Sequence, residues 1–235
     1  SSTSMFSAYD GLVSVSTGAA NNVRHSKIRV IHNGIATLAE PSSQKCDQLR
    51  KQLTDGQPLI LAVGRLVKAK GFDLLIPAMK DIPARLIIAG TGPDQALLQR
   101  YIEKNHLQNV RLLGHRDDIP ELMKACDLIV ISSRNEGFPY VLIEALHNER
   151  IILSTPIPDA LEFIPESALV PHADTHNIHQ SLNRALNNMS QLRLKYRSFH
   201  EKAQAVLTLD NMTKQTSDFY DLLLNEGQAM GKLRR

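Results

Sequence analysis

Two glutamates stand eight residues apart in the segment SSRNEGFPYVLIEAL, residues 132–146. Glu136 precedes a Gly-Phe-Pro turn, and the Pro139 ring suits the first turn of a helix. A helix from about Tyr140 places Glu144 just over one turn inside, with its side chain leaning toward the helix N-terminus. Amides at such an end bind anions, whereas carboxylates there accept hydrogen bonds from diols. The segment indicates an anionic ligand with polyol groups. The alternative for Glu136 is an anion that only stabilises the helix start, and the alternative for Glu144 is a solvated position on the helix face.

A cationic loop, GRLVKAKG, follows the apolar run of residues 59–63. Arg65 offers a two-pronged guanidinium and Lys70 a point charge, which together suit a diphosphate. Gly64 beside them lets the backbone approach the ligand. A diphosphate flanked by two polyols is a nucleotide sugar, and the two segments together favour that ligand. A solvated surface pair is the alternative for the two cations, and Lys68 is expected to be simply solvated.

The elements that must position these residues alternate between short apolar runs and helical patterns. From residue 59 onward the runs are rich in Val, Ile and Leu without polar alternation, as in parallel strands covered on both faces. The alternation predicts an α/β fold with a Rossmann-like, doubly wound parallel sheet. Ligands bind such sheets beyond the carboxyl ends of the strands. Four loops there carry glycines or cations: residues 64–71, 90–93, 114–118 and 132–139.

The expected boundaries follow from the same patterns. Residues 36–58 are polar and poor in strand formers, which predicts a loop or short helix between an N-terminal piece and the main sheet. The last helix is expected to begin at an Asp/Asn cap and to end before Gly227. Strands are predicted at residues 11–16, 28–31, 59–64, 85–90, 110–114, 127–132, 151–155 and 168–170, and helices at 72–79, 94–104, 118–125, 140–148, 174–188, about 191–206 and about 211–225.

The bulk composition limits the classes of function. The formal charge of +3 is too weak to indicate a nucleic-acid partner. Cys46 and Cys126 lie far apart without metal-type spacing, which indicates reduced thiols. The sequence contains no apolar run near the roughly 20 residues that span a bilayer, and its N-terminus lacks the blocks of a signal peptide. We therefore expect a cytoplasmic location, with any contact to the inner face of the membrane peripheral.

Several segments together resemble the C-terminal, donor-binding half of the family-4 glycosyltransferases of the GT-B fold. GRLVKAKG, LIIAGTGP, VRLLGH, DLIVISSRNEGFPYVLIEAL and IILSTPIPDALEFI match that half, and IRVIHNGI resembles the strand and turn that lead into it. TLDNMTKQTSDFYDLLL resembles a final helix that crosses back to the N-terminal domain. The resemblance divides the chain into the end of the N-terminal domain with linker strands (1–36), a linker (37–58), a Rossmann-like nucleotide-sugar domain (59–208), the crossing helix (209–226) and a tail (227–235).

The resemblance implies roles for single residues. Arg65 and Lys70 would hold the donor diphosphate and Glu136 the donor sugar, as the catalytic residues. Glu144 would bind the ribose hydroxyls. The other donor-binding residues that it implies are Gly64, Gly92, Gly137, Phe138, Pro139 and Tyr140, with His115 and Arg116 toward the nucleobase, mostly through their backbone.

The implied activity is transfer of a hexose from a nucleoside diphosphate sugar, with a UDP-sugar favoured, to a glycan or lipid-linked acceptor in polysaccharide or lipopolysaccharide biosynthesis. The family retains the anomeric configuration, and the acceptor hydroxyl is thought to attack on one face of the sugar as the diphosphate leaves. Cations and amides would stabilise that leaving group. The sequence contains no Asp-x-Asp, which argues for a metal-independent reaction, and no cofactor is expected beyond the donor substrate.

Family enzymes also have an N-terminal acceptor domain, of which only the tail is expected in this sequence. The chain alone would then bind donor but catalyse weakly or not at all. A non-catalytic nucleotide-binding module and a nucleotide-sugar epimerase are the alternatives. A nicotinamide dehydrogenase is disfavoured, because GTGP lacks the third glycine of the dinucleotide fingerprint.

Overall fold

The computed structural model describes residues 9–21, 23–37, 40–157 and 160–233. A five-stranded parallel sheet has the order β5-β4-β3-β6-β7, which runs outward from β3 in both directions. This is the doubly wound arrangement that the alternating pattern predicts. The strands are β3 (Leu59–Val63), β4 (Arg85–Ala89), β5 (Val110–Gly114), β6 (Leu128–Ile131) and β7 (Ile151–Ser154).

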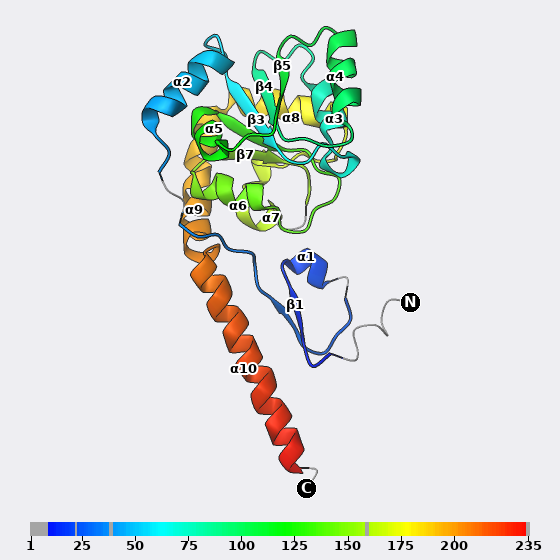
Figure 1. Cartoon of the computed structure of the whole chain (residues 1–235), viewed down its shortest axis with the longest axis vertical. Coiled ribbons are helices and arrows are strands. Elements are labelled where there is room, and N and C mark those ends of the chain that lie inside the picture. The colour runs from blue at the N-terminus through cyan, green and yellow to red at the C-terminus, as the bar shows by residue number, and fades with distance from the viewer. Residues whose placement is uncertain (1–8, 22, 38–39, 158–159, 234–235) are drawn as a thin grey trace.

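Four of the five strands are buried because their runs are apolar on both faces. Every residue of β6 and β7 is buried, as are four of the five residues of both β3 and β4. Right-handed crossovers place the helices after β3 and β4 on one face and those after β5 and β6 on the other, and Figure 1 shows this layered domain above a long helix. The helices are α3 (Phe72–Ala78), α4 (Gln95–Lys104), α5 (Ile119–Ala125), α6 (Tyr140–His147), α8 (Thr175–Asn187) and α9 (Met189–Val206).

The polar segment before β3 contains a helix, α2 (Ser43–Leu53), which confirms one of the two expectations for it. Ser42 caps the helix by accepting a hydrogen bond from the Lys45 amide. The helix packs against α5. Arg50 ties α2 to the sheet, because its guanidinium donates to Asp127 Oδ2 at 2.8 Å.

A small N-terminal unit lies beside the long C-terminal helix in Figure 1. β1 (Leu12–Ser14) and β2 (Ile28–Val30) pair in parallel around a short helix, α1 (Thr17–Ala20). The unit contacts α10 (Leu209–Leu233), where the Phe219 side chain is buried and a methyl group on Gly11 would lie 2.8 Å from the Phe219 ring. The connection to the main domain also passes α10, because Ile35 pairs with Thr208 just before the helix begins.

Two predicted elements differ from the structure. The segment predicted as a strand at 168–170 begins in a single turn of 3₁₀ helix, η2 (Glu166–Ala168), and makes only an isolated bridge between Leu169 and Ser154. Its N-cap, Pro165, fixes the entry into that turn.

The last helix also differs at both ends. Thr208 Oγ1, rather than an Asp or Asn side chain, accepts the hydrogen bond from the Asn211 amide at 3.2 Å. The helix then runs through Gly227 to Leu233 instead of ending before it, so the predicted 227–235 tail is helical as far as residue 233, and residues 234–235 lie outside the described part. A glycine weakens a helix by only about 1 kcal/mol, and the good helix formers Ala, Met, Lys and Leu follow it. Within the described residues, no helix is both long and apolar enough to cross a membrane.

Candidate functional site

The strand order places a crevice between β3 and β6. Connections leave β3 toward β4 and return to the opposite side of β3 at β6, and ligands of open α/β sheets bind where the strand order reverses in this way. The cationic loop 64–71 follows β3 and the loop 132–139 follows β6, so the two segments singled out from the sequence face each other across this crevice.

The two loops meet through a glycine. Gly71 has φ 69°, and a methyl group at that position would lie 2.0 Å from the Ser132 carbonyl oxygen. Ser132 Oγ in turn donates to the Lys70 carbonyl oxygen at 2.8 Å. A second close approach holds the β4 loop in place, because a methyl group on Gly92 would lie 2.3 Å from the Leu66 carbonyl oxygen. The structure therefore gives Gly92 a role in loop packing, whatever it does toward a ligand.

Lys70 and Glu136 form an ion pair between the β3 and β6 loops. The ammonium contacts Glu136 Oε1, and the Ser133 hydroxyl donates to the same oxygen at 2.8 Å. The side chains are only 25% and 14% exposed. The stem of Lys70 passes over Gly64, where a methyl group would lie 3.5 Å from it. The sequence predicts both residues as ligand contacts; the structure brings them together and pairs them with each other.

Glu144 lies in α6 and is half-buried. Among the described residues, its carboxylate has no hydrogen-bond or salt-bridge partner. Burial raises the pKa of this carboxyl above the usual value for a glutamate. Because α6 begins at the crevice and helical side chains lean toward the N-terminus, the unpaired carboxylate is available as an acceptor near the crevice. The solvated helix face that the sequence left open does not describe this residue.

Arg65 lines a cavity at the carboxyl ends of β3, β4 and β5. The side chain is exposed, and the cavity has a volume of about 340 Å³. His115 and Arg116 line the same cavity, so three of the residues predicted from separate loops come together there. Arg116 donates to both oxygens of Asp118 at 2.8 and 2.6 Å, which raises the pKa of the guanidinium and lowers that of the carboxyl.

The Gly-Phe-Pro turn is fixed by an aromatic cluster. The Phe138 ring is buried, with its centroid 5.2 Å from that of His32 and 5.6 Å from that of Phe163. Its side chain is therefore unavailable to a ligand, and Asn33 donates to its carbonyl oxygen at 3.3 Å. Gly137 and Tyr140 are exposed on either side, whereas Pro139 is buried as the N-cap of α6.

Three residues that the sequence interpretation did not assign complete the crevice. Ser133 holds Glu136, and Arg134 forms a two-pronged ion pair with Asp73. Lys68, expected to be solvated, donates to the same aspartate at 2.6 Å although its side chain is 76% exposed. Ser133 and Arg134 lie in the motif-bearing segment itself, which was the only signal. Within the described part of the chain, no group of His, Cys, Asp and Glu side chains is arranged to hold a metal ion.

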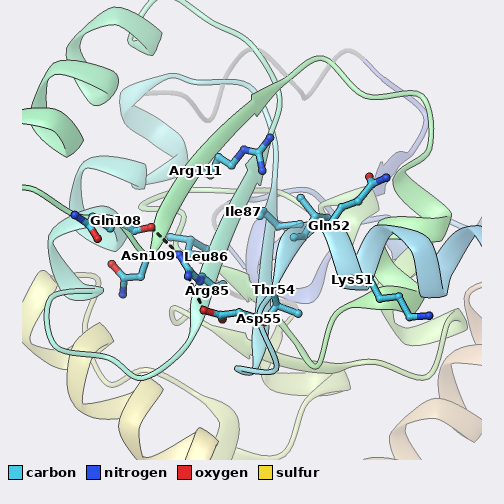
Figure 2. Close-up of a pocket in the computed structure, with 11 residues that line it drawn as sticks. Lys51, Gln52, Thr54, Asp55, Arg85, Leu86, Ile87, Gln108, Asn109 and Arg111 are labelled. Carbon is cyan, nitrogen blue, oxygen red and sulfur yellow. Dashed lines mark hydrogen bonds and ion pairs between the residues drawn. The ribbon is translucent and has the colours of Figure 1, made fainter.

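A second cavity, of about 320 Å³, lies at the opposite edge of the sheet (Figure 2). It is lined by the end of α2 and by the amino-terminal ends of β4 and β5. Arg85 crosses it and donates to Asp55 and to the Gln108 carbonyl oxygen, both at 2.9 Å. Since open α/β sheets bind their ligands at the carboxyl ends of the strands, this cavity is not the candidate site.

Solved structures share this fold. The Anabaena protein HepE, in complex with UDP and glucose, matches with a TM-score of 0.81 at 22% identity, over 90% of this chain and 63% of that one. A sucrose-phosphate synthase from Thermosynechococcus elongatus matches with a TM-score of 0.79 at 22% identity, over 91% of this chain and 58% of that one. These likenesses confirm the predicted fold, the Rossmann-like C-terminal half of GT-B glycosyltransferases.

Sequence relatives agree with the structural ones. The GPI3 subunit of the Saccharomyces cerevisiae phosphatidylinositol N-acetylglucosaminyltransferase is 28% identical over 216 residues, 87% of this chain and 48% of the relative. The O-antigen chain mannosyltransferase C of Escherichia coli is 25% identical over 179 residues, 73% of this chain and 48% of the relative. The chain thus spans about half the length of these curated relatives. The family profile described as "Glycosyl transferases group 1" matches residues 45–205, more than half of the 235 residues, and the chain therefore belongs to the group 1 glycosyl transferases.

Proposed function

We propose that this chain is the donor-binding half of a retaining hexosyltransferase that uses a nucleoside diphosphate sugar, most favourably a UDP-sugar. The observation that carries the proposal is the crevice between β3 and β6. There a lysine–glutamate pair, an unpaired half-buried glutamate and an arginine-lined cavity lie on neighbouring strand ends. Such a surface offers cations to a diphosphate and carboxylates to hydroxyl groups on either side of it.

In this proposal Lys70 and Arg65 bind the diphosphate. Recruitment of Lys70 by the ligand separates it from Glu136, whose carboxylate then accepts hydrogen bonds from the donor sugar. The exposed amide of Gly137 contributes a donor beside it. Glu144 accepts from the ribose hydroxyls, and the cavity at His115 receives the base.

The proposed reaction is a transfer in which the acceptor hydroxyl attacks the anomeric carbon while the bond to the diphosphate breaks. The negative charge that develops on the leaving diphosphate would be stabilised by Arg65, Lys70 and nearby amides, without a metal ion. The acceptor's proton would pass to the leaving phosphate. Because the nucleophile approaches from the side that the leaving group vacates, the anomeric configuration would be retained.

The acceptor side lies outside this chain in the proposal. The chain spans about half of its curated relatives, and β1–β2 is only a two-stranded pair, which is too small to be stable alone. We propose that a preceding acceptor domain completes both the small sheet and the active site. The relatives' names refer to a phosphatidylinositol and to an O-antigen chain, which supports a lipid-linked or glycan acceptor.

The first test is calorimetry and thermal melting of this chain with UDP, GDP, ADP and their sugar conjugates, in the presence of a chelator. A ligand at about 100 times its Kd should stabilise the fold by roughly 2.7 kcal/mol. We expect a UDP-dependent shift that Glu144→Ala reduces. Failure of all the nucleotides to bind would contradict the proposal. Conversion of a nucleotide sugar to its epimer without acceptor would favour the epimerase alternative instead.

A further inference from the structure

A charged cluster links the two loops of the crevice behind Lys70. Arg134, from the β6 loop, donates to the two carboxylate oxygens of Asp73 at 2.6 and 2.9 Å and to the Lys68 carbonyl oxygen at 2.7 Å. Asp73 lies in the first turn of α3, which follows the cationic loop. The Arg134 and Asp73 side chains are only 29% and 28% exposed. Residues 61 positions apart in the sequence are thus joined by a two-pronged ion pair.

We propose that Arg134 and Asp73 are positioning residues that clasp the turn carrying Lys70, so that its ammonium stays where the donor diphosphate binds. The proposal deepens the proposed function and rests on it, because it assigns to this pair the geometry of the diphosphate contact. The Arg134–Asp73 pair is thus a clasp between the β6 loop and the start of α3.

The main chain shows which part the clasp fixes. Residues Lys68–Lys70 form a single 3₁₀ turn, η1, with Lys70 as its last residue. The Arg134 amide donates to the Ala69 carbonyl oxygen at 2.8 Å, so the β6 loop grips the turn by its backbone as well. A turn of three residues has few hydrogen bonds of its own. A shift of that turn moves the Lys70 ammonium with it.

The same geometry distinguishes a clasp from a ligand contact. Both terminal nitrogens of Arg134 already donate to protein oxygens. Two of the three hydrogen bonds go to the Asp73 carboxylate, in the two-pronged geometry that suits a guanidinium and a carboxylate. Burial alone would raise the pKa of the Asp73 carboxyl, but hydrogen bonds from Arg134 and Lys68 lower it below its usual value. The aspartate is therefore held as an anion by its two cations.

The test uses calorimetry of UDP and of uridine with Arg134→Ala, Asp73→Ala, the double variant and Arg134→Lys. We expect each alanine variant to weaken UDP binding roughly ten- to a hundredfold, the range of a lost hydrogen bond to a charged group, while uridine binding stays unchanged. The double variant should lose no more than either single one, because both remove the same clasp. Arg134→Lys should retain part of the affinity. Asp55→Ala is the matched control, since it removes an Arg–Asp pair at the opposite edge of the sheet, and it should bind UDP like the parent.

One outcome would overturn the proposal directly. If Asp73→Ala binds UDP as tightly as the parent and only Arg134→Ala loses affinity, Arg134 is a ligand contact and not a positioning residue. Equal losses for UDP and uridine would likewise indicate general damage to the fold instead of a misplaced Lys70.

Amide hydrogen exchange tests the clasp without any nucleotide. The Lys70 and Gly71 amides, which donate to the Val67 and Lys68 carbonyl oxygens within the turn, should exchange faster in both alanine variants, with α4 unchanged. Unchanged exchange at these two amides would refute the clasp even if UDP binds. A parent chain that binds no nucleotide, with faster exchange in the variants, would instead refute the proposed function and leave the clasp supported.

Discussion

The two glutamates of the crevice, Glu136 and Glu144, differ in the groups that surround their carboxylates. Glu136 shares one oxygen between a lysine and a serine, whereas Glu144 is half-buried and has no partner among the described residues. Two carboxylates of one short segment are therefore in opposite electrostatic situations. The first accepts hydrogen bonds from two neighbours, whereas burial raises the pKa of the second.

Glu144 is expected to make stability depend on pH. Its folded pKa is raised, so the folded chain binds more protons than the unfolded chain between the unfolded and folded pKa values. Its contribution to the free energy of unfolding is then highest below the unfolded value and is lost as pH rises through the folded one. Glu144→Gln should remove this loss, so the variant should melt higher than the parent at neutral pH and show a flatter pH profile. A variant that melts lower at neutral pH would show that the carboxylate has a stabilising partner.

The same substitution should weaken nucleotide binding. A hydrogen bond from a hydroxyl to a charged acceptor contributes about 1.5–3 kcal/mol, so Glu144→Gln should bind UDP roughly tenfold less tightly than the parent. Deoxyuridine diphosphates are the matched ligands. If Glu144 accepts from ribose, the parent should lose affinity for them and the variant should not distinguish them from UDP.

Lys70→Ala and Arg65→Ala should separate diphosphate from nucleoside recognition. Each removes a cation from the crevice or from the cavity that Arg65 lines, so UDP affinity should fall while uridine affinity stays close to that of the parent. Calorimetry at low and high salt checks this, because the UDP affinity of each variant should also depend less on ionic strength. Equal losses for uridine and UDP would place these cations elsewhere.

Sequence patterns predicted which strand ends carry the candidate site residues, but not how their side chains pair. Lys70 and Glu136 follow two paired parallel strands, β3 and β6, whose carboxyl ends the fold brings together. The Lys70–Glu136 contact and the Arg134–Asp73 pair depend on which side chains of two distant segments meet. The spacing along the chain does not encode that, because each segment carries several charges.

At the scale of elements, the turn between β3 and α3 depends on a glycine. Gly71 links η1 to α3 in a left-handed conformation and lies against the β6 loop. Any side chain here meets the Ser132 carbonyl oxygen, so the two loops can approach only at a glycine. The junction of loop and helix is thus set by backbone packing as well as by the ion pairs around it.

Gly71→Ala should destabilise the domain more than its φ angle alone requires. The left-handed conformation costs a non-glycine residue about 1–2 kcal/mol, and the contact 2.0 Å from a carbonyl oxygen adds to that. Gly114→Ala is the matched control, because Gly114 has φ 70° with open space around it. Denaturant unfolding should rank the parent first, then Gly114→Ala, then Gly71→Ala. Equal stability of the two variants would contradict the close approach.

Elements with long apolar runs were predictable, and those decided by local caps were not. Four of the five strands of the main sheet follow from runs that are buried on both faces, and the edge strand β5 follows from a run that also carries the exposed Arg111. The 3₁₀ turn at residues 166–168 and the continuation of α10 through Gly227 depend on small conformational differences that tertiary packing decides. The cap at Thr208 was missed because Asp210 and Asn211, stronger capping types on average, follow it directly.

At the scale of the whole molecule, α10 is the surface on which the N-terminal unit rests. Phe219 is buried against Gly11, while Tyr220 beside it is 62% exposed. Lys27 and Glu226 form an exposed ion pair along the same contact. The N-terminal unit is therefore held to the main domain through α10 and through the linker that pairs with the start of that helix. The His32 ring, just after β2, adds direct contacts to Phe138 and Phe163.

Phe219→Ala should release the N-terminal unit without unfolding the main sheet. Removing a buried Phe side chain costs about 3–5 kcal/mol, and here that loss falls on the contact between α10 and the β1–β2 pair. Hydrogen exchange should become faster at residues 12–14 and 28–30 and stay unchanged in β3 and β6. Tyr220→Ala, at the neighbouring exposed position, should leave both regions as in the parent. Global unfolding of the Phe219 variant would show that the N-terminal unit is part of the main cooperative core.

The pairing of Lys70 with Glu136 has a consequence for turnover. On the proposed function, a donor that draws Lys70 away compensates Glu136 by presenting sugar hydroxyls to it. The nucleoside diphosphate product also binds Lys70, but it has no donor-sugar hydroxyls that could donate hydrogen bonds to Glu136. Re-forming the internal pair would then compete with the product for Lys70. The Glu136 carboxylate would thus compete with the nucleoside diphosphate product for Lys70. This competition would favour product release and let the next donor bind.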